Sequence, residues 1–292
     1  MMPDYKKSEH RHKLAEGILW DHRSELLLFV DIISKKLFRM DIDSFKIVDE
    51  FCFNEYIGWV QITNKPGYYI IGLKSGIATF NVENSEIKFI NKEVPQYSYQ
   101  RLNDSFVDVR GRLWYGSMEY KSIEYYNGVL ANFSSKEDKV NIRDVGYGIT
   151  NGPIIDNENN YFFHNDSKKG IVYRFDYDID KGEIKGKSIF LQFNPKTMTP
   201  DGMCIDDQNN LFIAIWGGAS VNEYKQSGEL IKSYRLPEKF ITNVCFGGKN
   251  LKRMFVTTAK SDGFDFSKQT GGHIYEVLGH NRHGLEANIF KI

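Results

Sequence analysis

Residues 201–216 read DGMCIDDQNNLFIAIW, and this stretch contains the unit from which the fold is built. An apolar run with polar ends (201–206) leads into a polar turn, and a second apolar run (211–216) follows at once. Two such runs joined by Asp, Gln and Asn are typical of a β-hairpin. Almost no window of the chain has the spacing of an amphipathic helix, so we expect an all-β protein.

The same hairpin recurs at a regular spacing. Its first core positions, 41 to 50 residues apart, are Leu27, Tyr68, Leu113, Tyr161, Leu211 and Met254. A second series of strands ends at the anchors Met40, Phe80, Tyr126, Phe175, Tyr224 and Val277. Repeats of about 40 to 50 residues with four short strands each indicate β-propeller blades. The sequence therefore predicts a six-bladed β-propeller with four-stranded antiparallel blades around a central channel.

The repeats leave no room for a second domain. No Ser- or Pro-rich linker divides them, so we expect residues 1–292 to form a single propeller domain. Residues 1–12 precede the first repeat. They could be a terminal arm, or a strand that closes the ring.

Composition excludes several classes of partner. The chain has 292 residues, and its 38 Lys and Arg balance 38 Asp and Glu, which favours neither nucleic acid nor a membrane surface. No apolar run is long enough to span a bilayer, and the first dozen residues lack an apolar signal region. Three cysteines are too few for a disulfide framework, and Cys52 and Cys245 are expected to be buried. We therefore expect a soluble, cytoplasmic protein.

A third series of positions marks where the first strand of each repeat begins. These positions are Glu16, Gly58, Asn103, Asn151, Asp201 and Asn243. Because the first strand of a propeller blade lines the channel, all six should meet on one rim. Carboxylate and amide oxygens form a hard ligand set that suits Ca²⁺, Mg²⁺ or Mn²⁺. A divalent metal is expected there, although each residue taken alone could be a turn former.

The second strand of each hairpin returns to the same rim. It ends at Asp166 in the fourth repeat and at Trp216 in the fifth. Asp166, with Ser167, could support a ligating Asn or a bound water, or could simply close a turn. Trp216 could form a wall of the site or pack in the core. His164 is more simply a residue outside the site than a ligand.

Several segments together are similar to one known family. They are EGILWD (16–21), RLND (101–104), GRLWYGSM (111–118), TNG (150–152), NDS (165–167), PDGM (200–203), WGG (216–218) and TNVCFGG (242–248). The chain resembles the senescence marker protein/regucalcin/gluconolactonase family of six-bladed propellers over about nine tenths of its length. No single one of these segments would be enough to indicate the family.

The resemblance implies a metal-dependent hydrolase that opens a sugar lactone. It implies one divalent ion (Ca²⁺, Zn²⁺, Mn²⁺ or Mg²⁺) held by Glu16, Asn151 and Asp201, with Asp201 also the catalytic residue. It also implies that Arg101 and Asn103 contact the substrate. The family's acidic substrate contact would fall at Glu119, which follows Met118 directly where relatives have a small residue first.

Other functions remain open at this point. The chain could be a calcium- or metal-binding regulatory propeller without lactonase activity, or a hydrolase of another lactone or ester. A non-catalytic interaction propeller would have no reason to concentrate oxygens at the rim, and calorimetry with Ca²⁺ or Zn²⁺ would then detect no site.

Overall fold

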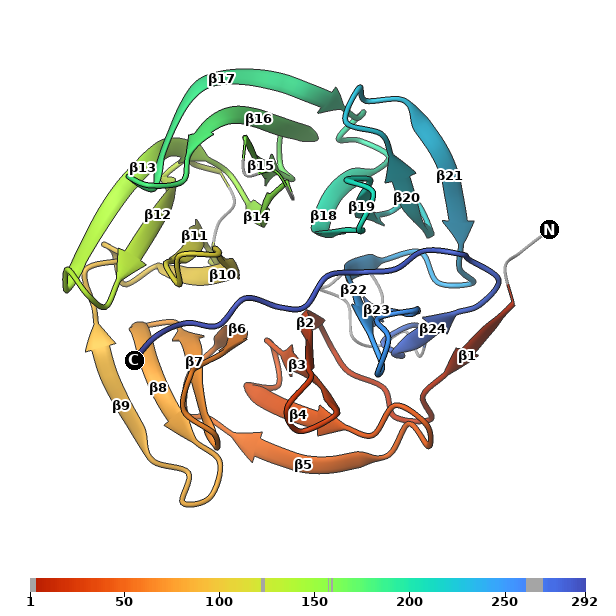
Figure 1. The fold of residues 1–292 in the computed structure, drawn as a ribbon, viewed down its shortest axis with the longest axis horizontal. Coiled ribbons are helices and arrows are strands. Elements are labelled where there is room, and N and C mark those ends of the chain that lie inside the picture. The colour runs from red at the N-terminus through yellow and green to blue at the C-terminus, as the bar shows by residue number, and fades with distance from the viewer. Residues whose placement is uncertain (1–3, 122–123, 157, 159, 261–269) are drawn as a thin grey trace.

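The computed structural model describes residues 4–121, 124–156, 158, 160–260 and 270–292. These residues form six four-stranded antiparallel sheets that surround a central axis like the blades of a propeller (Figure 1). The expected all-β, six-bladed architecture is confirmed. The described residues include no helix long and apolar enough to cross a membrane.

Each of the first five blades runs from its inner strand outward. The first two blades consist of β2 (Ala15–Asp21), β3 (Leu26–Asp31), β4 (Lys36–Met40) and β5 (Ile47–Cys52), and of β6 (Ile57–Ile62), β7 (Tyr68–Leu73), β8 (Gly76–Asn81) and β9 (Ile87–Asn91). The third consists of β10 (Gln100–Val107), β11 (Leu113–Glu119), β12 (Gly128–Ser134) and β13 (Lys139–Tyr147). The fourth and fifth consist of β14 (Thr150–Ile155), β15 (Tyr161–Asp166), β16 (Ile171–Asp178) and β17 (Glu183–Gln192), and of β18 (Thr199–Ile205), β19 (Leu211–Trp216), β20 (Ser220–Tyr224) and β21 (Leu230–Arg235).

The last blade combines the two ends of the chain. It contains β22 (Ile241–Gly247), β23 (Arg253–Thr258), β24 (Tyr275–Val277) and, as its outer strand, β1 (Tyr5–Lys7). Tyr5 pairs with Val277 and Lys7 with Tyr275. The N-terminal strand therefore closes the ring by hydrogen bonds rather than by a covalent link.

Two details expected from the sequence are wrong. Tyr126 is not the anchor of a strand, because β12 begins only at Gly128 and Tyr126 is exposed in the preceding loop. Cys52 is exposed rather than buried, whereas Cys245 is buried as expected. Cys52 ends the outer strand β5, where exposed and partly buried side chains alternate. An apolar run in sequence does not distinguish an outer strand from an inner one.

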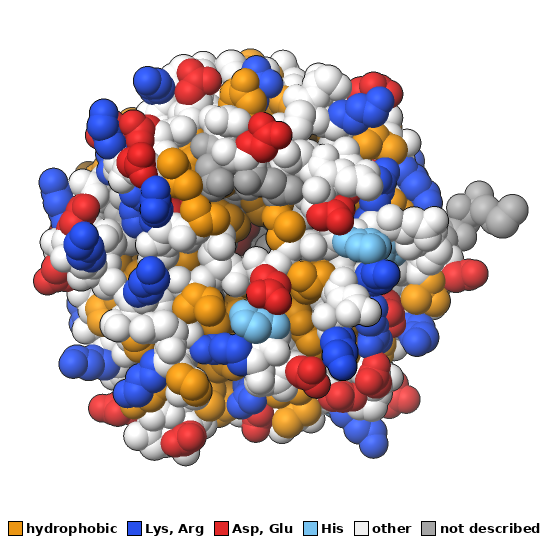
Figure 2. Space-filling model, in the orientation of Figure 1, with side chains coloured by type: hydrophobic (Ala, Val, Ile, Leu, Met, Phe, Trp, Pro, Cys, Tyr) orange, Lys and Arg blue, Asp and Glu red, His pale blue; other side chains and the backbone are white. Residues whose placement is uncertain are grey.

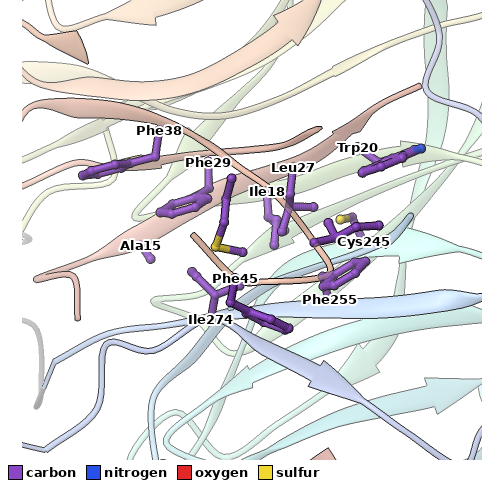
Figure 3. Close-up of a cluster of buried hydrophobic side chains, with 12 residues drawn as sticks. Ala15, Ile18, Trp20, Leu27, Phe29, Phe38, Phe45, Cys245, Phe255 and Ile274 are labelled. Atoms are coloured by element: carbon purple, nitrogen blue, oxygen red, sulfur yellow. The ribbon is translucent and has the colours of Figure 1, made fainter. Parts of the chain in front are cut away.

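The cores lie between neighbouring blades. Figure 3 shows the cluster between the first and last blades, to which Phe29 and Phe38 of the first and Phe255 and Cys245 of the last all belong. The rings of Phe29 and Phe38 stack with their centroids 5.1 Å apart. Fully burying a side chain of this size contributes about 1.5–3 kcal/mol. These interfaces hold the inner strands in fixed positions around the channel.

All six inner strands begin at one rim, and each has a β-bulge close to its start. The register shifts lie between Glu16 and Leu19, Ile57 and Trp59, Leu102 and Ser105, Asn151 and Ile154, Pro200 and Met203, and Ile241 and Asn243. A bulge changes the direction of the side chains beside it. The rim residues predicted from the sequence lie at or beside these bulges.

The C-terminal segment crosses the opposite end of the channel (Figure 1). The Gly284 N–H donates to Leu251 O over 2.8 Å, and Asn288 Nδ2 donates to Val107 O over 2.9 Å. Phe290 is fully buried between the second and third blades. The two ends of the channel therefore differ, with polar side chains at one and a strap of chain at the other.

Candidate functional site

The rim brings together polar side chains from five blades. Glu16, Asn103, Asn151, Asp201 and Asn243 are each no more than 6% exposed. Burial of polar groups costs free energy unless each one has a partner. The contacts of these side chains therefore define what the rim can hold.

A chain of hydrogen bonds connects three of the blades. Arg101 Nη1 donates to Asn103 Oδ1 over 2.5 Å, and Asn103 Nδ2 donates to Asn151 Oδ1 over 2.7 Å. Asn151 Nδ2 donates to Ser167 Oγ over 2.9 Å, and Ser167 Oγ donates to Pro200 O over 2.6 Å. The residues assigned to substrate (Arg101, Asn103) and to metal (Asn151) thus belong to one network, which fixes their orientation.

Two carboxyl groups share this buried space. Burial and the charge of Asp104 raise the pKa of Glu16 to about 8. Burial and the charges of Glu16 and Asp104 raise the pKa of Asp201 well above its ordinary value. Asp201 Oδ1 is buried and has no hydrogen-bond partner among the described residues. Buried carboxyl groups whose charges act on one another favour either a proton or a cation between them.

Asp104 is a third carboxyl group in this space, and it was not among the site residues predicted from the sequence. It accepts hydrogen bonds from the backbone N–H of Ser105 over 2.8 Å and of Gly152 over 2.7 Å. Burial raises its pKa to about 6. Asp104 therefore connects the bulges of the third and fourth blades. Its position directly after Asn103 on an inner strand was the available signal.

Arg101 brings positive charge to the same space. Burial lowers its pKa to about 10, while the charges of Glu16, Tyr56 and Asp201 act in the opposite direction. The guanidinium is therefore still cationic at neutral pH. Among the described residues its hydrogen-bond acceptors are Leu102 O and Asn103 Oδ1, both reached by Nη1.

Glu119 lies close by in sequence but has a different partner. It pairs with Gln100 across β10 and β11, and it accepts a hydrogen bond from Asn127 Nδ2 over 2.9 Å. Gln100 Nε2 donates to Asn127 O. The structure describes no hydrogen bond or ion pair between Glu119 and Arg101. Glu119 therefore supports the loop beside the rim rather than joining the network above.

Asp166 has the contacts of a residue that closes a turn. It accepts hydrogen bonds from the backbone N–H of Gly148, and its Oδ2 lies 3.2 Å from Lys169 Nζ. Asp31 accepts backbone N–H bonds at the matching place in the first blade. The contact to Asn151 is made by the neighbouring Ser167.

Two aromatic candidates pack away from the network. The ring of Trp216 lies 4.7 Å from that of Phe240, and the two residues also form a backbone bridge. His164 is fully buried, with its ring centroid 4.6 Å from that of Tyr147. Burial lowers the pKa of His164 to about 3, so this imidazole is neutral.

The donor set at the rim fits a hard divalent cation. Glu16 and Asp201 supply carboxylates and Asn151 supplies an amide oxygen, and all are oxygen donors. Within the described ranges there is no cluster of three or more His, Cys, Asp or Glu side chains arranged to hold a metal. An ion here would therefore depend on amide oxygen as well as on carboxylates. The unpartnered Asp201 Oδ1 is one atom that such an ion would satisfy.

The channel continues below the rim as a cavity of about 450 Å³, lined largely by apolar residues of the inner strands and by residues 285–288. Figure 2 shows the strap face, where hydrophobic side chains lie beside a hollow near the middle. Asp104 and Asn243 line the cavity as well as belonging to the rim region.

Comparison with protein families matches residues 14–260 to the model described as the SMP-30/gluconolactonase/LRE-like region. Regucalcin of Gallus gallus is 30% identical over 278 residues, which are 92% of each chain. A Bacillus subtilis protein named as a candidate sugar lactone lactonase, YvrE, is 28% identical over 87% of this chain and 86% of its own.

Solved structures share the whole architecture. A luciferin-regenerating enzyme superimposes with a TM-score of 0.92 at 26% identity, covering 99% of this chain and 100% of its own. The similarity in structure therefore extends across all six blades.

Proposed function

We propose, starting from the fact that this chain belongs to the SMP-30/gluconolactonase/LRE-like family, that it is a divalent-metal-dependent hydrolase that opens a sugar lactone. One observation carries the proposal. Glu16 and Asp201 are both buried, the charge of Glu16 acts on Asp201, and Asp201 Oδ1 has no hydrogen-bond partner among the described residues. The sugar lactone lactonase name of one relative supports the reaction class.

The metal would be held by Glu16, Asn151 and Asp201, which come from the first, fourth and fifth blades. A divalent cation bound there would supply Lewis-acid stabilisation of the negative charge that ester hydrolysis places on the carbonyl oxygen. The hydrogen bonds from Asn103 and to Ser167 hold the Asn151 amide in one orientation. Asn151 is therefore a pre-organised ligand.

The protein's own groups would bind the sugar and move one proton. Arg101 donates hydrogen bonds to substrate oxygens, and Asn103 holds its guanidinium in place. Asp201 accepts the proton of the attacking water as a general base. The water oxygen bonds to the carbonyl carbon, the bond from that carbon to the ring oxygen breaks, and the proton passes to the ring oxygen. The product is the hydroxy acid.

The proposal is tested with metal-stripped protein assayed against a panel of sugar lactones and divalent ions. We expect hydrolysis of a lactone such as D-glucono-1,5-lactone to disappear on chelation and to return with at least one ion. Asp201→Asn should lose turnover by about 10²-fold or more, while Arg101→Ala should mainly raise KM. Full activity after chelation, or in Asp201→Asn, would overturn the proposed function.

A regulatory metal-binding propeller is the second candidate, because vertebrate regucalcins are among the similar proteins. Such a protein would bind the ion at the same three residues and leave lactones intact. Calorimetric titration of the stripped protein with Ca²⁺, run beside the hydrolysis assay, separates the two functions. Binding without turnover of any lactone in the panel favours the second.

A further inference from the structure

Loops on the rim face carry tyrosines and lysines in contact with one another. Tyr56 directly precedes β6, Tyr120 directly follows β11, and their rings meet edge to face with centroids 5.4 Å apart. The charge of Tyr56 acts on Arg101, and the Tyr120 N–H donates to Tyr99 O. These rings therefore border the entrance to the site on the side of Arg101.

Each of two tyrosines has two lysines over its ring. Lys74 Nζ and Lys121 Nζ lie 5.1 and 5.9 Å from the ring centroid of Tyr120. Lys168 Nζ and Lys169 Nζ lie 4.4 and 4.7 Å from the ring of Tyr126. A lysine over an aromatic face gains electrostatic attraction from the ring.

The positions of these lysines in the fold place all of them at the rim. Lys74 lies between β7 and β8, Lys121 follows β11, and Lys168 and Lys169 lie between β15 and β16. Lys35, between β3 and β4, adds a fifth ammonium group 5.7 Å from the ring of Tyr56. The lysines therefore come from four neighbouring blades and surround one part of the entrance.

Most carboxylates in or beside the same loops already have other partners. These carboxylates are Asp31, Glu55, Glu119, Glu124 and Asp166. Glu55 accepts hydrogen bonds from Ser75, Glu119 accepts one from Asn127, and Asp166 pairs with Lys169. Within the described residues neither Lys74 nor Lys121 forms an ion pair. Two ammonium groups near one ring repel each other, and an anion between them removes that repulsion.

We propose that this entrance selects a lactone with a negatively charged group, a phosphate or a carboxylate, at the end away from its carbonyl. The inference rests on the proposed function and specifies its substrate class. The buried network of Arg101 and Asn103 takes the sugar, while the lysines at the entrance take the anion. Tyrosine faces beside them offer apolar contact to the C–H face of a sugar ring.

The test compares three lactones of one sugar: the neutral form, a phosphate-bearing form and a carboxylate-bearing form. The double variant Lys74→Gln with Lys121→Gln is measured beside Lys65→Gln. Lys65 is the matched control, because it lies 3.8 Å from the ring of Tyr68 at the strap end of the second blade. None of these three lysines belongs to the buried network of the site.

The wild type should have a higher kcat/KM for at least one charged lactone than for the neutral one. The double variant should lose about tenfold on that charged lactone and less than twofold on the neutral one, and Lys65→Gln should change neither. The ranking of the two charged substrates identifies which anion is preferred. Equal kcat/KM for all three lactones, or an equal loss on neutral and charged forms, would overturn the proposal.

Failure of the proposed function gives a different pattern. If no lactone is hydrolysed, binding of the ring-opened sugar acid with and without its phosphate is measured by calorimetry. Tighter binding of the phosphorylated acid that is lost in the double variant supports the anion site by itself. Equal binding of the two acids rules it out.

Discussion

Among single residues, Glu16 and Asp201 show how a site can be assembled at the expense of stability. Both are buried, burial and the charge of Asp104 raise the pKa of each, and the charge of Glu16 raises that of Asp201 further. A carboxyl group with a raised pKa in the folded state binds a proton that the unfolded chain has already released. The site is therefore prepared for a cation and is destabilising without one.

The first prediction concerns the pH dependence of the metal-stripped protein. Between the ordinary pKa of Glu16, 4.5, and its folded value of about 8, the folded state binds more protons than the unfolded state. The free energy of unfolding should therefore fall as pH rises through this range. Glu16→Gln should remove part of that dependence, so the difference in Tm between variant and wild type should grow from pH 5 to pH 8. If calorimetry finds the same difference in Tm at every pH, the raised pKa of Glu16 is contradicted.

His164 gives a second prediction, with the opposite sign. Neither ring nitrogen has a hydrogen-bond partner within the described part of the chain, and burial lowers its pKa to about 3. Below its ordinary pKa of 6.5, the unfolded chain binds a proton that the folded state excludes, so stability is lost as pH falls. His164→Phe keeps an aromatic ring against Tyr147 and removes the unpaired nitrogens.

We expect His164→Phe to be more stable by about 1–3 kcal/mol and to lose less stability between pH 6.5 and 4. Denaturant unfolding at pH 7 and pH 4 measures both effects. A variant less stable than the wild type at both pH values would mean that the imidazole has a partner. Lactone hydrolysis serves as the control and should not change, since His164 lies outside the site network.

At the scale of the elements, the β-bulges place the site side chains. The residue after Glu16, Asn151 and Asp201 is a glycine in each case, and Gly17 and Gly152 have positive φ angles of 56° and 52°. A Cβ on Gly152 would lie 2.7 Å from Met203 Cγ and 3.1 Å from Asp201 O. The bulge thus needs glycine for its backbone conformation and for space.

Gly152→Ala tests this role of the bulge. We expect it to destabilise the protein by about 1–3 kcal/mol and to weaken metal binding, because the clash falls on the strand that carries Asp201. Gly279→Ala is the matched control, with a positive φ of 70° but nothing within 4 Å of the added Cβ. It should reproduce the backbone strain without the loss of metal affinity. Equal metal affinity in the two variants, measured by calorimetry, would mean that the bulge at Gly152 does not position the metal ligands.

The blades and their inner strands could be predicted from the sequence because each strand start recurs with its own spacing. The third strand of the third blade could not be predicted correctly. Tyr125 and Tyr126 have the pattern of a strand end in the sequence, but they are exposed, and the buried strand is Gly128–Ser134. In the sequence, the only sign of a bulge is a glycine. Asp104 was missed because its contact, the N–H of Gly152, is 48 residues away in the chain.

For the whole molecule, stability depends on closing a ring of six blades. Each blade packs on its two neighbours, so the first and last blades must be held together although they lie at opposite ends of the chain. The cluster between them contains Phe29 and Phe255 (Figure 3). β1 strengthens this closure by covering the outer edge of β24. An uncovered strand edge favours pairing with another chain.

Deletion of residues 1–7 should therefore weaken the ring without touching the site. It removes the three residue pairs between β1 and β24, and we expect Tm to fall by roughly 5–10 °C. Below the new Tm, hydrolysis per folded molecule should be unchanged, because Glu16, Asn151 and Asp201 are on inner strands. Calorimetry measures the shift, and size-exclusion chromatography should detect self-association through the bare edge of β24. An unchanged Tm after deletion of residues 1–7 would mean that the packing between the first and last blades closes the ring without help from β1.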